Sequence, residues 1–163
     1  MNCNNCNNCD NKNIDTKYGC RKCGNKGMNV EFDTVFKLSN EYLRHTLSVD
    51  EQFYLCTNPC CNVAYYTLEG RIIETDNVNV DIWYKKNRTK FIVCYCRDIS
   101  LDDVVLAVDK LTDINIDTIV HFLQKDDIHT DCIHHNPTGL TCEKLFNNAI
   151  EYAKKIKNMK TKL

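Results

Sequence analysis

The sequence lacks the features that would place the chain in a membrane, outside the cell or on nucleic acid. No apolar run approaches the roughly 18 residues that a membrane-spanning helix needs, so we expect no membrane partner. The first residues lack the basic start and apolar stretch of a signal peptide, which favours a cytoplasmic location. Charge is balanced, with Lys+Arg 21 against Asp+Glu 22, so we expect no nucleic-acid partner.

The sequence also lacks the usual signatures of hydrolytic and nucleotide-dependent enzymes. It has no paired catalytic carboxylates, no nucleophile elbow and no glycine-rich phosphate loop. What it has is cysteine, at 12 of 163 residues. Disulfides rarely persist in a reducing compartment, so these thiols are expected to be metal ligands. The alternative is a set of buried free cysteines, but they stand beside Gly, Asn, Pro and charged residues rather than in apolar runs.

The pattern along the chain predicts an α+β protein in three parts. Residues 1–19 form a polar Asn/Cys-rich lead with too little apolar surface to order itself without a ligand. Residues 20–93 are expected to form a small β-rich zinc ribbon. Residues 94–163 are expected to form a helical domain with a lysine-rich tail.

In the β-rich part, the stretches 52–56 and 62–67 are rich in Tyr, Phe and Val and flank a turn at Asn58 and Pro59, which predicts a hairpin. Alternating apolar residues over 78–84 predict a half-buried strand. The segment 34–47 fits a helix only partly.

In the last part, Ser100 is expected to cap a helix that begins with two aspartates. A second helix is predicted around 116–123. A third, with Thr141 as its cap, is predicted over 145–156.

The first cysteine constellation predicts a structural zinc site. Cys20 and Cys23 form a CxxC knuckle followed by Gly24, and a second pair comes from the predicted hairpin, giving four sulfurs. Neighbouring strand residues point to opposite sides, so only one of Cys60 and Cys61 reaches the ion. Cys61 leaves room for the turn and is preferred. The predicted ligands are Cys20, Cys23, Cys56 and Cys61. A redox CxxC is the rival interpretation.

The second constellation predicts a [2Fe–2S] cluster. Cys94 and Cys96 are too close in sequence for an ordinary zinc knuckle but can hold one iron, and Cys132 and Cys142 can hold the other. A second zinc site is the alternative for the same four residues. His134 and His135 lie between the last two cysteines; a Rieske-like histidine pair is considered, but we interpret both as loop residues.

Four motifs carry a resemblance to a known family: CRKCG, YLCTNPCCNVAYY, VCYCRD and CIHHNPTGLTC. Their order is similar to the N-terminal domain of cluster-containing CopZ copper chaperones over about residues 18–153. The resemblance implies a zinc site and a [2Fe–2S] cluster on the cysteines named above. The cluster half resembles the bacterioferritin-associated ferredoxin (BFD-like) domain.

The resemblance implies a function in copper homeostasis. We expect cupric reductase-like one-electron transfer, delivery of Cu(I), or both. The expected partners are a copper-transporting ATPase or another copper protein, and an electron donor that the sequence does not identify. The alternatives are a two-zinc binding module without redox activity and a bacterioferritin-associated-type ferredoxin.

The sequence departs from the family after the last helix. Members continue into a copper-carrying domain, which we do not expect here because the sequence stops at Leu163. The candidate copper ligands are then Cys3, Cys6 and Cys9 of the lead, because thiolates suit Cu(I).

Overall fold

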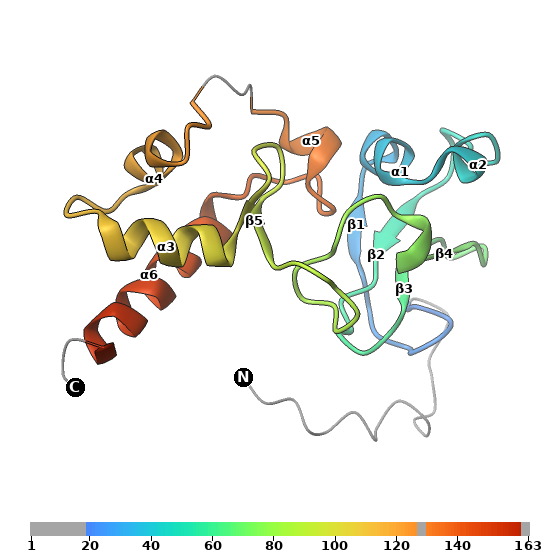
Figure 1. Cartoon of the computed structure of the whole chain (residues 1–163). Helices are drawn as coiled ribbons and strands as arrows, with labels where there is room; N and C mark the ends of the chain where they lie inside the picture. The colour runs from blue at the N-terminus through green and yellow to red at the C-terminus, as the bar shows by residue number, and fades with distance from the viewer. Residues whose placement is uncertain (1–18, 127–129, 161–163) are drawn as a thin grey trace.

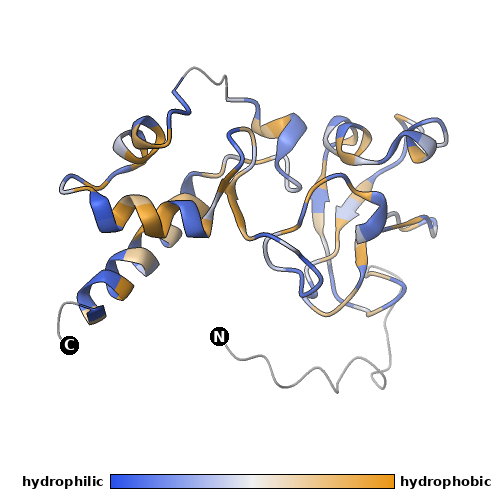
Figure 2. Cartoon of the chain, viewed as in Figure 1, coloured by the Kyte–Doolittle hydropathy of each residue, from blue (hydrophilic) through white to orange (hydrophobic). Residues whose placement is uncertain are grey.

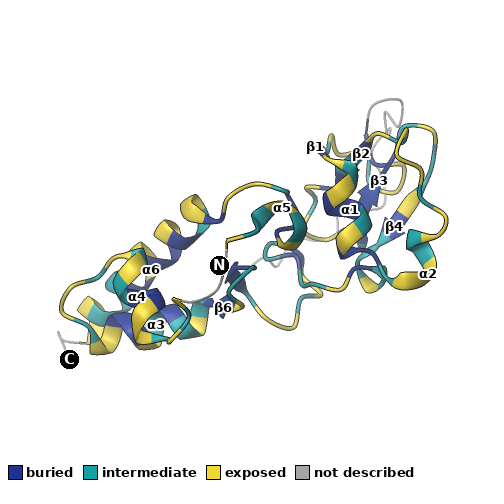
Figure 3. Ribbon diagram, turned by 90° about the horizontal axis from the view of Figure 1, so that it is seen from above, coloured by how far each residue is buried: buried dark blue, intermediate teal, exposed yellow. Residues whose placement is uncertain are grey.

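The computed structural model describes residues 19–126 and 130–160 (Figure 1). It is a mixed helix and sheet fold with two larger hydrophobic cores. Viewed from above, the four-stranded sheet with α1 and α2 lies at one end, and α3, α4 and α6 lie at the other (Figure 3). Cys3, Cys6 and Cys9 lie outside the described residues.

One antiparallel sheet organises the first half, in the order β1 (Met28–Val30), β2 (Phe53–Leu55), β3 (Val63–Tyr66) and β4 (Ile72–Glu74). The predicted hairpin is confirmed, because β2 pairs with β3 in the register Tyr54↔Tyr66. All four residues of β3 are buried, so this central strand forms the middle of the core.

The segment 34–47 is divided between two short helices, α1 (Phe32–Leu38) and α2 (Glu41–Arg44). Ser39 and Asn40 adopt extended backbone between them, with ψ of 151° and 161°. The Asn40 side chain accepts a hydrogen bond from the backbone of Leu43 and so caps α2. This cap explains why the periodicity fitted one continuous helix only partly.

The predicted strand over 78–84 is wrong. Val78 forms only an isolated bridge with Ser39, after the short helix η1 (Thr75–Asn77). Val78 and Ile82 are buried, which explains the alternation in the sequence. However, the Asn79 N–H donates to Leu38 at the end of α1, and the Lys85 N–H donates to Ile82 within a turn, so neither bond is made to a strand. Alternating burial therefore arises here without a neighbouring strand.

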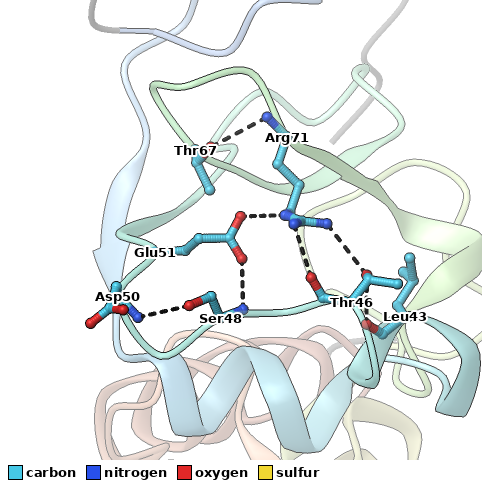
Figure 4. A network of polar contacts seen from close by, with 7 residues as sticks. All are labelled: Leu43, Thr46, Ser48, Asp50, Glu51, Thr67 and Arg71. Atoms are coloured by element: carbon cyan, nitrogen blue, oxygen red, sulfur yellow. Dashed lines mark hydrogen bonds and ion pairs between the residues drawn. The ribbon is translucent and has the colours of Figure 1, made fainter.

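The loop before β2 is tied to the β3–β4 hairpin by one arginine (Figure 4). The Arg71 guanidinium donates to the Glu51 carboxylate and, at 3.0 Å, to the Thr46 carbonyl. Glu51 in turn accepts from the Ser48 backbone at 2.9 Å. This network therefore holds the loop before β2 against the β3–β4 hairpin.

The second half begins with a small hairpin, β5 (Ile92–Cys94) and β6 (Ile99–Ser100), so β5 crosses the expected boundary at residue 93. Hydrophobic stretches run along β5 and the middle of α3 (Figure 2). Val93 and Ile99 are fully buried against helices α3 (Leu101–Lys110), α4 (Ile116–Phe122) and α6 (Glu143–Lys160).

Of the two predicted helix caps, Ser100 is confirmed and Thr141 is wrong. Ser100 caps α3 in a full capping box with Asp103, as predicted. Thr141 is exposed and α6 begins at Glu143, so Cys142 is the residue directly before the helix. The short helix α5 (Cys132–His135) was not predicted, and it packs against α1. No helix in the described part of the chain has both the length and the apolar character needed to cross a bilayer.

Candidate metal centres

The first predicted constellation forms a compact group of four sulfurs. The Sγ atoms of Cys20, Cys23, Cys56 and Cys61 all lie within 4.8 Å of one another. Cys20 Sγ is 4.0 Å from Cys61 Sγ, and Cys23 Sγ is 3.6 Å from Cys56 Sγ. Four thiolates around one tetrahedral zinc, at Zn–S of about 2.3 Å, lie about 3.8 Å apart. The donor set and its spacing therefore fit Zn²⁺.

The CxxC knuckle is shaped by backbone hydrogen bonds to Cys20. Its carbonyl accepts from Cys23 N–H at 3.2 Å and from Gly24 N–H at 2.6 Å. Gly24 has a φ of 71°, a conformation that suits glycine. A side chain at Gly19 would meet the Gly24 carbonyl at 2.4 Å, so both glycines allow the knuckle to close.

The second pair of zinc-site cysteines, Cys56 and Cys61, flanks a turn at Asn58, and we call this segment the second knuckle. The side-chain oxygen of Asn58 accepts a hydrogen bond from the Cys60 N–H at 2.9 Å. The backbone carbonyl of Asn58 accepts one from the Cys61 N–H at 3.3 Å. The turn leaves Cys60 exposed and buries Cys61. The structure thus brings Cys61, rather than Cys60, to the other three sulfurs.

A buried lysine braces the second knuckle, and sequence reasoning missed it. Lys85 is only 1% exposed, and its ammonium donates to the carbonyls of Asn58 at 2.8 Å and Cys61 at 3.0 Å. The neighbouring Tyr84 hydroxyl donates to the Cys56 carbonyl at 2.9 Å. Hydrogen bonds with Cys20 and Cys61 and burial raise the pKa of Cys56, and the charge of the Lys85 ammonium acts in the opposite direction. No local pattern around Lys85 signals this role.

The four sulfurs influence one another strongly. Hydrogen bonds from Cys56 and Cys61 lower the pKa of Cys20 to about 3. The hydrogen bond between Cys20 and Cys56 raises the pKa of Cys56. One sulfur of the group is therefore ready to be a thiolate at neutral pH, which is the form that binds a metal.

The second predicted constellation meets around one cavity. Cys94 ends β5, Cys96 lies in the β5–β6 turn, Cys132 begins α5 and Cys142 precedes α6. All four line a cavity of about 720 Å³, whose other walls include Ile116, Val120 and Phe146. Cys94 Sγ is 3.8 Å from Cys96 Sγ.

These four sulfurs are more widely spread than the first group. In the part of the chain that the structure describes, only the Cys20 group gathers three or more ligand atoms closely enough for one ion. Cys94 and Cys142 are buried, whereas Cys96 and Cys132 are partly exposed. All eight cysteines of the two groups are free thiols.

A contact to Cys142 was also missed. Asn136 donates its side-chain N–H to Cys142 Sγ at 3.3 Å. The pKa of Cys142 is lowered, first by a hydrogen bond from Cys94 and further by this amide. The sequence motif indicated only that Asn136 and Pro137 start a turn.

The two histidines do not line the cavity. His134 and His135 lie on α5, not in a loop as predicted, and both turn toward Asp131. His134 Nδ1 is 2.8 Å from the Asp131 carboxylate, and His135 Nδ1 is 2.8 Å from the Asp131 carbonyl. Both rings are therefore held by Asp131, which itself lines the cavity.

Comparisons with known proteins agree with the first centre. No curated protein matches the chain. Its fold is similar to the X-ray structure of the Archaeoglobus fulgidus CopZ N-terminal domain, with a TM-score of 0.62 and 22% identity. That match covers 80% of this chain and 95% of the other. A family model described as a zinc binding domain, zf_CopZ, matches residues 17–79. The match and the four-cysteine group together support a CopZ-type zinc-binding domain in the first half of the chain.

Proposed function

We propose that the chain is a two-centre metalloprotein that transfers single electrons in copper homeostasis. Zinc is held by Cys20, Cys23, Cys56 and Cys61 and is structural. A [2Fe–2S] cluster is held by Cys94, Cys96, Cys132 and Cys142. The observation that carries the proposal is the convergence of this second set of four cysteines on one cavity.

The zinc assignment follows from the closed donor set. Four thiols supply all four positions of a tetrahedron, which leaves none for a substrate. The sheet is small, with strands of three or four residues, so metal binding supplies part of its folding energy. Zinc has no redox chemistry, and electron transfer therefore belongs to the second centre.

The cluster assignment rests on the spacing of the second set. A [2Fe–2S] cluster takes two thiolates on each of two irons. Cys94 and Cys96, 3.8 Å apart, would hold one iron, and Cys132 and Cys142, whose side chains are in hydrogen-bond contact, would hold the other. When bound, such a cluster accepts and donates one electron at a time.

The protein surroundings of the cavity determine where an electron enters or leaves. Cys94 and Cys142 lie on the buried side, whereas Cys96 and Cys132 lie nearer to solvent. The buried side is lined by apolar side chains such as Val120 and Phe146. A redox partner therefore approaches from the side of Cys96 and Cys132.

The copper role rests on the similarity to CopZ, in the family model and in the fold. CopZ-type proteins are copper chaperones, and thiolates bind Cu(I) rather than Cu(II). A reduced cluster held by these cysteines could supply the one electron that converts Cu(II) to Cu(I), and the electron donor would then reduce the cluster again. The expected recipients of Cu(I) are a copper-transporting ATPase or another copper protein.

Visible absorption of protein purified without air tests the proposal. Wild-type protein is expected to be red-brown and to bleach with dithionite. Cys94→Ala and Cys132→Ala are expected to remove the colour and leave zinc bound, because neither belongs to the first group. Cys23→Ala is the matched control and should lose zinc. A colourless, folded wild-type protein with two zinc ions would reject the redox function and favour a binding module.

A further inference from the structure

Asn136 is a buried amide beside the second centre. Only 3% of its surface is exposed, and it lies in the loop that connects α5 to Cys142. Its side-chain nitrogen donates to Cys142 Sγ at 3.3 Å and to the Leu140 carbonyl at 2.8 Å. Each N–H of a buried amide needs a hydrogen-bond acceptor, and one of the two acceptors here is a cysteine sulfur.

The orientation of this amide is set by its neighbours. Its oxygen accepts from the Thr138 backbone N–H at 3.0 Å and from the Thr138 hydroxyl at 2.9 Å. A backbone N–H can only donate, and the Leu140 carbonyl can only accept. A flipped amide would lose both bonds, so the nitrogen must face Cys142.

The loop itself is fixed by the zinc-binding half. The Tyr65 hydroxyl donates to the Pro137 carbonyl at 2.8 Å, and the Thr34 hydroxyl donates to the Ile133 carbonyl at 2.7 Å. Gly139, with φ of 69°, lies so close to Thr34 that an added Cβ would be 2.7 Å from its hydroxyl. Asn136 therefore has little freedom to turn away from the sulfur.

We propose that Asn136 is a positioning residue that raises the reduction potential of the cluster through its hydrogen bond to Cys142. This inference rests on the proposed function, in which Cys142 is an iron-bound thiolate. A thiolate has no S–H and can only accept the bond. Reduction adds negative charge to the cluster and its sulfurs, so the N–H stabilises the reduced state more than the oxidised state.

The potential of the cluster in Asn136→Ala measures this contribution. Loss of the bond is expected to lower the reduction potential by about 59 mV. For one electron, this equals a roughly tenfold shift of the equilibrium toward the oxidised state. Asn136→Asp keeps the shape but replaces the donor with an acceptor, so a larger shift in the same direction is expected. Asn148→Ala, an exposed asparagine on α6, is the matched control and should leave the potential unchanged.

A measurement on the wild-type protein covers the case in which neither variant assembles a cluster. Asparagine labelled with ¹⁵N only at the side-chain amide is incorporated, and the reduced protein is studied by pulsed electron paramagnetic resonance. A coupling from this nitrogen to the cluster spin is expected. An unchanged potential in Asn136→Ala, or no ¹⁵N coupling in the wild type, overturns the inference. Absence of any cluster from the wild type overturns the proposed function instead.

Discussion

The hydroxyl of Tyr65 in β3 donates a 2.8 Å hydrogen bond to the carbonyl of Pro137, 72 residues further along the chain. Tyr65 is fully buried, four residues after the zinc-site cysteine Cys61. Pro137 lies between the two late cysteines, Cys132 and Cys142. The sheet of the zinc-binding half therefore supports the loop on which the second centre depends.

Removing this hydroxyl is expected to loosen the second centre without affecting the first. Tyr65→Phe leaves the Pro137 carbonyl buried without a donor, which costs about 1–3 kcal/mol in the free energy of unfolding. The cluster should then be lost faster in the presence of an iron chelator. The decay of visible absorbance measures this rate, and zinc analysis checks the first centre.

Tyr152→Phe is the matched control, because Tyr152 lies on α6 and is 52% exposed. It should leave both the decay rate and the stability unchanged. Equal decay rates for Tyr65→Phe and wild type would show that the sheet does not support the cluster loop.

Lys85 is expected to contribute to zinc affinity. Lys85→Met keeps the length of the side chain but removes the ammonium that holds the Asn58 and Cys61 carbonyls. Outer partners of metal ligands typically change metal affinity by about 10–100-fold. We expect a loss of that size in a competition titration with a zinc chelator.

Lys37→Met, at an exposed position on α1, is the control for removing a positive charge. Its zinc affinity should equal that of the wild type. If Lys85→Met also binds zinc as tightly as the wild type, the buried ammonium has no part in shaping the second knuckle.

The cap of α3 is expected to make stability sensitive to acid. Burial raises the pKa of Asp103, but hydrogen bonds from the Ser100 hydroxyl and backbone outweigh it, so the pKa lies below its ordinary value. A lowered pKa means that the unfolded state binds more protons in acid. The contribution of Asp103 is therefore complete above about pH 4 and is lost as the pH falls through the folded-state pKa.

Asp103→Asn should lower the free energy of unfolding by about 0.5–1 kcal/mol at pH 7. The difference from wild type should shrink below about pH 4. Urea unfolding at a series of pH values measures it, and metal release in acid affects both proteins equally. A difference that stays constant down to pH 2.5 would contradict the lowered pKa.

The lead sequence is expected to add copper capacity. Deleting residues 1–12 removes Cys3, Cys6 and Cys9 and should lower the number of Cu(I) ions bound per chain. The cluster spectrum should not change, since the deletion removes none of the eight cysteines of the two centres. Titration with Cu(I) against a chromogenic chelator gives the stoichiometry, and an equal stoichiometry in both proteins would show that the lead does not bind copper.

The elements that local chemistry determines could be predicted from the sequence. Ser100 and the aspartates after it predicted α3, and the turn at Asn58 predicted the β2–β3 hairpin. The first cysteine grouping could also be predicted, because a CxxC pair is joined by a second pair from the hairpin. The structure places the second four cysteines on one cavity, and their role as cluster ligands stays a prediction. The choice of Cys61 over Cys60 followed from the alternation of side chains and the room needed for the turn.

The features that were missed depend on contacts between distant segments. Residues 78–84 alternate like a strand, but they have no neighbouring strand to pair with. Lys85 is ordinary in sequence and becomes important only because the Asn58 turn folds against it. The contact between Asn136 and Cys142 depends on the loop geometry that Tyr65 and Thr34 fix from the other half.

The central claim is that the two groups of four cysteines hold different metals. Metal analysis of protein purified without air, together with an electron paramagnetic resonance spectrum of the dithionite-reduced sample, tests it most directly. We predict one zinc and two irons per chain, and a signal from a one-electron-reduced [2Fe–2S] cluster. Two zinc ions with no iron and no signal would contradict it.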